Sequence, residues 1–234
     1  MIVLDASSKG FLERSDALGW WDWLVGIYLE AKALPSVSTI AEARDAMGPY
    51  SWRALCRVAT VYQLWTRESV DYLARMLVDV GARTVLEVGA GDGRLTQSLA
   101  IRLTPLGVSV VGQDDGSWAA MKGVQPAVCA LRQESIPESL AAVAPDTVLV
   151  SWMPYNADWS PWFRDSASVE RYIFIGEDRY GCTGTPDLWE PPDGWHVAEC
   201  EGFSETAASR IDTSVGETSA WMVSRNVGEM ATLS

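Results

Sequence analysis

The residues that most clearly indicate ligand binding lie in a glycine-rich stretch that follows a short apolar run. Glu87 is followed at close intervals by Gly89, Ala90, Gly91 and Gly93. Glycine permits positive φ and lets a ligand approach the backbone, because it has no Cβ. A helical pattern begins directly after the stretch, so free amides of a helix N-terminus would face the ligand. The stretch therefore predicts a binding site for a nucleoside.

Two carboxylates stand where such a site needs a second contact. Asp114 and Asp115 follow the strand pattern of residues 107–113. They lie about 20 residues after the glycine turn, where dinucleotide-binding folds hold ribose hydroxyls. We expect these two acids at the ribose.

The glycine spacing and Glu87 narrow the kind of nucleoside. A dinucleotide fingerprint has the spacing Gly-x-Gly-x-x-Gly, whereas Gly89, Gly91 and Gly93 give Gly-x-Gly-x-Gly. An acidic residue before the turn would repel a pyrophosphate, and it would suit an ammonium or sulfonium group. NAD binding, and a glycine turn without any ligand, remain alternatives.

Residues 85–96 resemble motif I of the class I S-adenosylmethionine-dependent methyltransferases, and Asp114 falls where that family keeps its ribose-binding acid. The resemblance implies S-adenosyl-L-methionine as cofactor, held mainly by Glu87, Gly89, Gly91 and Asp114. It also implies an α/β fold, a Rossmann-like doubly wound sheet of seven strands with a C-terminal antiparallel hairpin.

The adenine contact is expected after the third predicted strand, where Gln133 and Glu134 stand. In the resembled family a side chain at this place, often an Asp, contacts the adenine. The resemblance therefore implies this role for Gln133 or Glu134. A solvated turn is the alternative.

The segment after the fourth predicted strand is expected to meet both donor and acceptor. Amino-group methyltransferases of the resembled family often carry Asp/Asn/Ser-Pro-Pro-Tyr/Phe/Trp here, and Pro154 with Tyr155 matches its second half. The resemblance implies donor contacts for Ser151 and Trp152, and acceptor contacts for Trp152, Met153, Pro154 and Tyr155. Aromatic faces stabilise positive charge. Packing of Trp152 and Met153 under the sheet is the alternative.

Two acids and the only histidine are the remaining candidates for proton transfer. Glu177 and Asp178 end the fifth predicted strand and could receive a cationic acceptor or take its proton, although a solvated acidic edge is an equal interpretation. Histidine is a common general base in enzymes, but His196 begins the sixth predicted strand, away from the ligand edge. Tyr155, Glu177 and Asp178 are therefore the catalytic candidates.

A sulfonium methyl group is already electrophilic, so its transfer depends mainly on holding the nucleophile in line and excluding water. The chain has 12 tryptophans, and some could form a lid over a flat or cationic acceptor. Besides the segment after the fourth predicted strand, the aromatic candidates for binding the acceptor are Trp20, Trp21, Tyr28 and Trp159.

The order of predicted elements agrees with a doubly wound sheet. Helices are predicted within residues 10–80, at Phe11–Ala33, Ile40–Met47 and Ser51–Val80, so residues 1–81 form a helical extension or lid and residues 82–234 form the donor-binding core. The predicted strands lie near residues 84–88, 107–113, 126–130, 146–151, 170–176, 195–200 and 219–225. The predicted core helices lie near residues 93–103, 117–122, 136–143 and 159–166.

The amino-acid composition indicates which kinds of binding partner are unfavourable. The net charge is −13 and basic residues do not cluster, which disfavours nucleic acids and anionic membranes, because such binding neutralises phosphates. The four cysteines are far apart, so the sequence predicts no metal site and reduced thiols. It also shows neither a signal peptide nor an apolar run of about 20 residues. We expect a cytoplasmic monomer or homodimer.

These observations predict a methyltransferase that modifies a nitrogen or oxygen of a small organic acceptor, such as a secondary metabolite. A protein or peptide methyltransferase, a donor-binding module without catalysis and an NAD-dependent oxidoreductase are the alternatives.

Overall fold

A computed structural model of the chain describes residues 34–58, 61–117, 127–177, 183–208 and 218–226. Six strands in these ranges form one sheet in the order β2-β1-β3-β4-β6-β5. The strands are β1 (Thr84–Val88), β2 (Ser109–Gln113), β3 (Thr147–Ser151), β4 (Arg171–Glu177), β5 (Trp195–Glu199) and β6 (Thr218–Arg225).

Strands β1 to β4 run parallel to one another, so their carboxyl ends meet at one edge of the sheet. Strand β6 lies between β4 and β5 and is antiparallel to both. Residues of β1 and β3 are almost completely buried, which parallel strands require because helices cover both of their faces.

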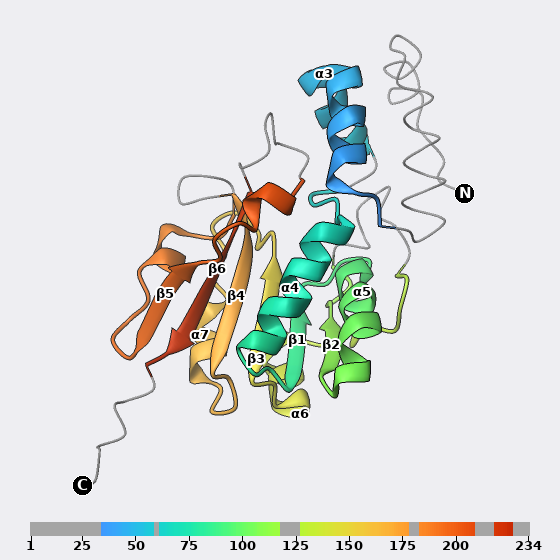
Figure 1. The fold of residues 1–234 in the computed structure, drawn as a ribbon. Helices are drawn as coiled ribbons and strands as arrows, with labels where there is room; N and C mark the ends of the chain where they lie inside the picture. The colour runs from blue at the N-terminus through green and yellow to red at the C-terminus, as the bar shows by residue number, and fades with distance from the viewer. Residues whose placement is uncertain (1–33, 59–60, 118–126, 178–182, 209–217, 227–234) are drawn as a thin grey trace, which may run out of the picture.

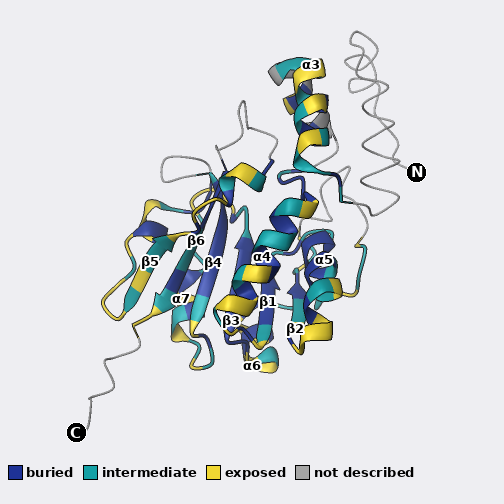
Figure 2. Cartoon of the chain, viewed as in Figure 1, coloured by how far each residue is buried: buried dark blue, intermediate teal, exposed yellow. Residues whose placement is uncertain are grey.

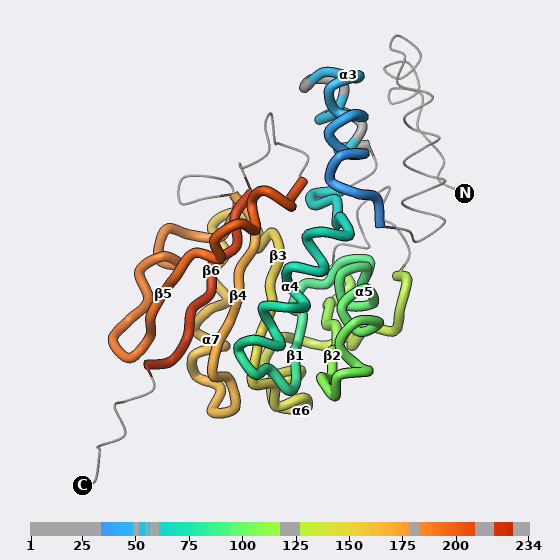
Figure 3. The backbone as a smooth tube through the Cα atoms, in the orientation of Figure 1, coloured from blue at the N-terminus to red at the C-terminus, as the bar shows by residue number. Residues whose placement is uncertain are grey.

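Helices cover both faces of the sheet (Figure 1). Helices α4 (Arg67–Asp79) and α5 (Arg94–Leu103) pack on one face, and α6 (Ile136–Val143) and α7 (Ser160–Asp165) pack on the other. Helix α3 (Val37–Val58) lies beyond the N-terminal end of α4, and Figure 3 traces it at the carboxyl edge of the sheet. The remaining helical turns are the 3-10 helices η2 (Thr104–Leu106), η4 (Pro186–Trp189) and η5 (Ser204–Thr206).

Alternate residues of each central strand enter different cores. Val85 and Leu149 pack with α4 and α5, whereas Leu86 and Val148 pack with α6 and α7. This alternation is the period of two of a β-strand, and Figure 2 shows the resulting band of buried residues through the sheet. The same alternation directs Glu87 toward α5, where it meets Thr96.

The N-terminal helices differ in part from the prediction. The predicted helix at residues 40–47 lies within α3, which bends at Gly48 (φ 73°, ψ 162°). The single helix predicted at Ser51–Val80 is wrong, because α3 ends at Val58 and α4 begins at Arg67. Thr66 starts the new helix as its N-cap, since the Ser69 amide donates to Thr66 Oγ1 at 2.9 Å. The helix predicted at Phe11–Ala33 lies outside the described residues.

Helix α4 belongs to the core beneath the sheet. Its residues Val70, Leu73 and Leu77 are fully buried in the same cluster as residues of α5 and the central strands. One apolar core thus continues across residue 81, where the sequence predicted the boundary between the extension and the donor-binding core.

The expectation of seven strands is wrong for the described residues, because residues 127–130 form no strand. Only an isolated bridge between Gln113 and Arg132 remains of the pairing with β2. Val128 is bound to the glycine turn and to α5 instead: its amide donates to the Asp92 carbonyl at 2.7 Å, and Gln97 Nε2 donates to the Val128 carbonyl at 3.2 Å. Contacts with the glycine turn therefore replace a strand ladder.

The connection from β4 to β5 has no α-helix in residues 183–194, where its helical turn is η4. This agrees with the glycines and prolines of this stretch, which do not favour a helix. None of the helices within the described ranges combines the length and the apolar character that crossing a membrane requires.

Candidate functional site

A cavity of about 700 Å³ lies at the carboxyl edge of the parallel strands. Ligands of open α/β sheets bind at this edge. The cavity collects twelve residues that the sequence nominated for the donor or the acceptor: Glu87, Gly89, Ala90, Gly91, Asp114, Asp115, Ser151, Trp152, Met153, Pro154, Tyr155 and Trp159.

The glycine turn after β1 takes a conformation that needs its glycines. Gly89, Gly91 and Gly93 have φ of 66°, 58° and 74°. A Cβ on Gly89 would come within 3.1 Å of the Trp159 ring, whereas a Cβ on Gly91 would meet nothing within 4 Å. Gly91 therefore presents bare backbone to the cavity. Gly93 lies outside the lining and packs against Cys129.

The amides of this turn are not free, which corrects the expectation that a ligand would lie over them. The Gly89 amide donates to Gln113 Oε1 at 3.3 Å, and the Ala90 amide donates to the Gln113 carbonyl at 2.9 Å. The Gly91 amide donates to Asp114 Oδ2 at 2.9 Å. The end of β2 thus fixes the shape of the turn after β1.

The Asp114 carboxylate has acceptor capacity left over. Its Oδ2 accepts from Gly91, and its Oδ1 accepts from the Gly116 amide at 2.9 Å. A carboxylate has about four lone-pair sites, so hydroxyl donors of a ligand can still bind. Asp115 is more exposed, and hydrogen bonds from Ser117 lower the pKa of its carboxyl group.

Glu87 is a carboxyl group almost completely removed from solvent, with 3% of its surface exposed. Burial raises its pKa to about 8, against a hydrogen bond from Thr96 Oγ1 to Oε2 that lowers it, and the charges of Asp92 and Asp114 raise it further. A cationic ligand in the cavity would oppose this shift, because it favours the ionised carboxylate.

The ionisable side chains that line the cavity are all acidic. Glu87, Asp92, Asp114 and Asp115 line it, and its described lining contains no Lys, Arg or His. Asp92 is partly neutralised by the buried Arg94, whose Nε lies 3.4 Å from Asp92 Oδ2. The cavity therefore favours neutral or cationic ligands over anionic ones.

Trp152 directly follows β3 and has a left-handed backbone conformation, with φ of 57°. A bulky residue in this region costs about 1–3 kcal/mol and persists only where its surroundings fix it. Three contacts do so. Its amide donates to the Ile175 carbonyl at 2.7 Å, its Nε1 donates to Gln63 Oε1 at 3.1 Å, and its ring lies 5.7 Å from that of Tyr62.

Residues 61–65 contribute to the site although the sequence pattern did not indicate them. Val61, Tyr62, Gln63 and Trp65 all line the cavity. The Leu64 amide donates to the Ala208 carbonyl at 2.9 Å, which fastens this segment to the chain after η5. Thr66, an N-cap residue before the helical pattern of α4, was the available signal that a helix could not continue through this segment.

The chain after Trp152 is held against the loop before η4. The Gly184 amide donates to the Met153 carbonyl at 3.1 Å, and the Asn156 amide donates to the Gly184 carbonyl at 3.0 Å. Met153 is buried, and its Sδ accepts from the Trp159 amide at 3.4 Å. Tyr155 keeps 67% of its surface exposed while it lines the cavity, so its ring is available to a ligand.

The residues expected at the adenine lie outside the lining. Gln133 is exposed, and Glu134 binds Arg132 and Ser139. Ser135, Ile136 and Pro137, at the start of α6, line this side of the cavity instead. Gln113 connects the two regions, since its Nε2 donates to the Glu134 carbonyl at 2.6 Å. Asp92, Gln113, Ser117 and Trp162 are further lining residues that were not predicted.

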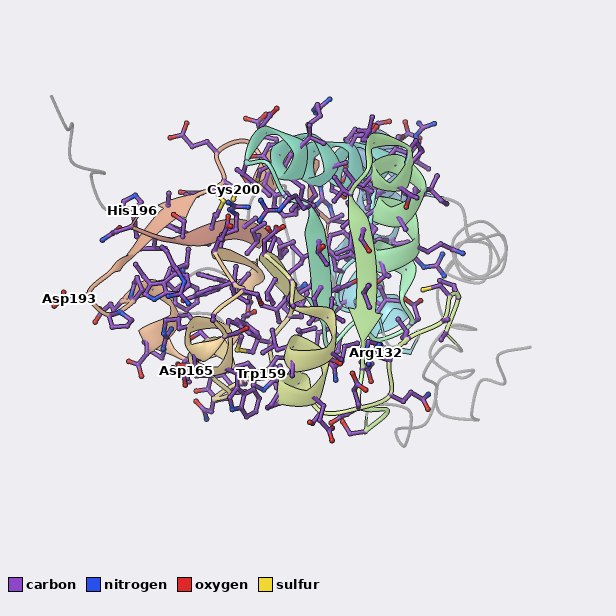
Figure 4. All side chains as sticks on the ribbon, turned by 90° about the horizontal axis from the view of Figure 1, so that it is seen from below. Arg132, Trp159, Asp165, Asp193, His196 and Cys200 are labelled. Carbon is purple, nitrogen blue, oxygen red and sulfur yellow. The ribbon has the colours of Figure 1, made fainter. Side chains whose placement is uncertain are left out.

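The proton-transfer candidates do not gather at the cavity. Glu177 lies outside the lining, and its amide donates to Thr183 Oγ1 at 3.0 Å. His196 is exposed on the edge strand β5, and Figure 4 shows it apart from Trp159. Trp20, Trp21, Tyr28 and Asp178 lie outside the described residues. Within the described part of the chain, no group of three or more His, Cys, Asp or Glu residues could hold a metal ion.

No family model matches the chain, and no curated protein matches it. Similar solved structures include the methyltransferase domain of a bacterial Hen1 protein, with 16% identity, a TM-score of 0.45 and coverage of 67% of this chain and 96% of that one. An S-adenosylmethionine-dependent O-methyltransferase from Thermotoga maritima has 12% identity and a TM-score of 0.43, with coverage of 74% and 71%. The plantazolicin methyltransferase BpumL, solved with a triazolic desmethylPZN analog and S-adenosylhomocysteine, has 10% identity and a TM-score of 0.43, with coverage of 67% and 83%. At these values the similarity assigns neither a family nor a reaction to the chain.

Proposed function

We propose that the protein transfers the methyl group of S-adenosylmethionine to a nitrogen or oxygen of a small organic acceptor, such as a secondary metabolite. The observation that carries this proposal is the acidic, aromatic cavity above the joined ends of β1 and β2. There Gly91 presents bare backbone beside the Asp114 carboxylate.

The charge of the cavity supports S-adenosylmethionine over a dinucleotide. The donor carries a sulfonium and an ammonium group, which suit a lining that contains Glu87 and Asp114 and, among the described residues, no basic side chain. A pyrophosphate would find neither a cation nor free turn amides here, because Gly89, Ala90 and Gly91 already donate to the end of β2.

In this proposal the donor's ribose hydroxyls bind Asp114, and its adenine lies near Ser135, Ile136 and Pro137. These residues and Asp114 line one cavity. The volume of about 700 Å³ falls within the usual range for small-molecule sites. The acceptor then lies toward Trp152, since β3 is the neighbour of β1 on the side away from β2.

Calorimetric titration of the full chain with S-adenosylmethionine, S-adenosylhomocysteine and NAD tests donor binding. We expect both sulfur nucleosides to bind and NAD to give no heat. Incubation with methyl-labelled donor and a panel of amines, phenols and short peptides then tests transfer. Tight binding of NAD alone would contradict the proposal, and donor binding without transfer to any acceptor would favour a module without catalysis.

A further inference from the structure

The two ends of the cavity carry different kinds of side chain. Carboxyl groups gather at the ends of β1 and β2, in Glu87, Asp114 and Asp115, whereas aromatic rings gather beside the end of β3, in Tyr62 and Trp152. Because β1 lies between β2 and β3, the acidic end and the aromatic end lie on opposite sides of the glycine turn. A donor held at Asp114 leaves the aromatic end to the acceptor.

The aromatic end has a fixed geometry. Trp152 is held in a left-handed conformation by its own amide, by its indole Nε1 on Gln63 Oε1 and by packing on Tyr62. Gln63 comes from a segment 89 residues away in the sequence. Two distant parts of the chain therefore cooperate to place one indole ring at the cavity, in a backbone conformation that a tryptophan rarely adopts.

The charge of the methylated product indicates which acceptors the aromatic rings of Tyr62 and Trp152 would favour. When a neutral nitrogen takes the methyl group, the positive charge of the sulfonium moves onto the acceptor, toward the aromatic rings, and aromatic faces stabilise a cation. When an oxyanion takes it, two charges are neutralised and the rings gain no cation. The carboxylates of the lining also repel an anionic acceptor and favour the protonated, unreactive form of an aliphatic amine.

From this arrangement we infer, on the basis of the proposed function, that the acceptor is a planar heteroaromatic compound whose neutral ring nitrogen is methylated against Trp152. The nitrogen lone pair forms the new N–C bond, and the C–S bond breaks with its electron pair on sulfur. The products are an N-methylated aromatic cation and S-adenosylhomocysteine. No proton is transferred, so the step needs no base.

Two ligands with similar rings and opposite charges test this inference on the wild-type chain. With S-adenosylhomocysteine saturating, we expect N-methylquinolinium to bind about tenfold more tightly than 1-naphthoate, in keeping with a cation held over an aromatic face. With S-adenosylmethionine, we expect quinoline to be methylated faster than 1-naphthol. Equal or tighter binding of naphthoate, or faster methylation of naphthol, would overturn the inference.

Substitutions of Trp152 test whether its indole ring causes the preference for the cationic ligand. Trp152→Leu should weaken N-methylquinolinium binding about fivefold or more, and by a larger factor than it weakens S-adenosylhomocysteine binding, because it removes a cation–π face. Trp152→Phe should retain most of the preference, and Trp195→Leu on β5, beyond the cavity, should retain all of it. Unchanged cation affinity in folded Trp152→Leu would overturn the inference. If the wild-type chain does not bind S-adenosylhomocysteine, the proposed function itself is refuted.

Discussion

The backbone amide of Gly91 donates a hydrogen bond of 2.9 Å to Oδ2 of Asp114. These residues lie at the ends of neighbouring parallel strands, β1 and β2, and are 23 positions apart in the sequence. One carboxylate thus fixes the glycine turn and faces the cavity. A ligand that binds Asp114 is thereby held over the one glycine of the turn that has open space before it.

Asp114→Ala should weaken the binding of both S-adenosylmethionine and S-adenosylhomocysteine by about 1–3 kcal/mol, because charge-assisted hydrogen bonds to ribose are lost. Calorimetric titration measures the effect. Asp187→Ala, which removes an exposed acid in η4, is the control and should bind both ligands as the wild type does. Equal affinities in the two variants would place the ribose contact elsewhere, and Asp115→Ala would then be the next variant to measure.

Gly91→Ala should reduce donor affinity about tenfold or more, since a methyl group would occupy the space that the ligand needs beside the turn. Gly81→Ala is a matched control. Gly81 has φ of 69° against 58° for Gly91, and a Cβ on either residue meets nothing within 4 Å. Both variants should lose a similar amount of stability, about 1 kcal/mol, yet only Gly91→Ala should lose donor binding. Equal donor affinities would contradict the placement of the ligand.

The buried carboxyl group of Glu87 should make the stability of the ligand-free chain depend on pH. The pKa of Glu87 is raised from 4.5 to about 8 in the folded chain. Between these values the unfolded chain has lost a proton that the folded chain retains, so stability decreases as the pH rises from about 5 to about 8 and then changes no further. Thermal unfolding across this range measures the slope.

Glu87→Gln should flatten that slope, because the amide does not titrate. Glu190→Gln, at an exposed position, should keep the slope of the wild type. If Glu87→Gln and the wild type lose stability in parallel between pH 5 and 8, Glu87 is ionised in the folded chain and the burial argument is wrong.

Asp146 at the opposite edge of the sheet should matter for stability alone. It is buried, accepts hydrogen bonds from the Arg83 and Thr84 amides at 2.9 and 3.1 Å, and lies 3.8 Å from the Arg171 guanidinium. Asp146→Ala should lower the free energy of unfolding by about 3–5 kcal/mol, as breaking a buried pair does. Denaturant unfolding measures it, and the exposed Asp165→Ala should cost far less. A cost of Asp146→Ala as small as that control would contradict this assignment.

The local signals of the sequence were reliable where one residue determines the conformation. Helix α6 begins and ends within the predicted range 136–143, because Ser135 and Glu138 cap it and Pro137 suits its first turn. The glycine turn was likewise predicted from the glycines themselves, since φ above zero at three positions favours glycine. The hydrogen bond that joins the turn to Asp114 was not predicted.

What the sequence missed depends on contacts between distant segments. Residues 61–66 were predicted as part of a continuous helix, although they lie outside any helix and Tyr62 and Gln63 line the cavity. The bond from Trp152 to Gln63 spans 89 positions, and no periodic pattern records it. Gln113 was also overlooked. Its backbone carbonyl and its side chain accept hydrogen bonds from the glycine turn, and these contacts form only when β1 and β2 lie side by side in the folded sheet.

A crystal structure of the full chain with S-adenosylhomocysteine tests the placement of the donor most directly. We expect both ribose hydroxyls about 2.5–3.0 Å from the Asp114 carboxylate and the sulfur facing the Trp152 side of the cavity. A nucleoside bound away from Asp114, or an empty cavity at saturating ligand, would contradict it.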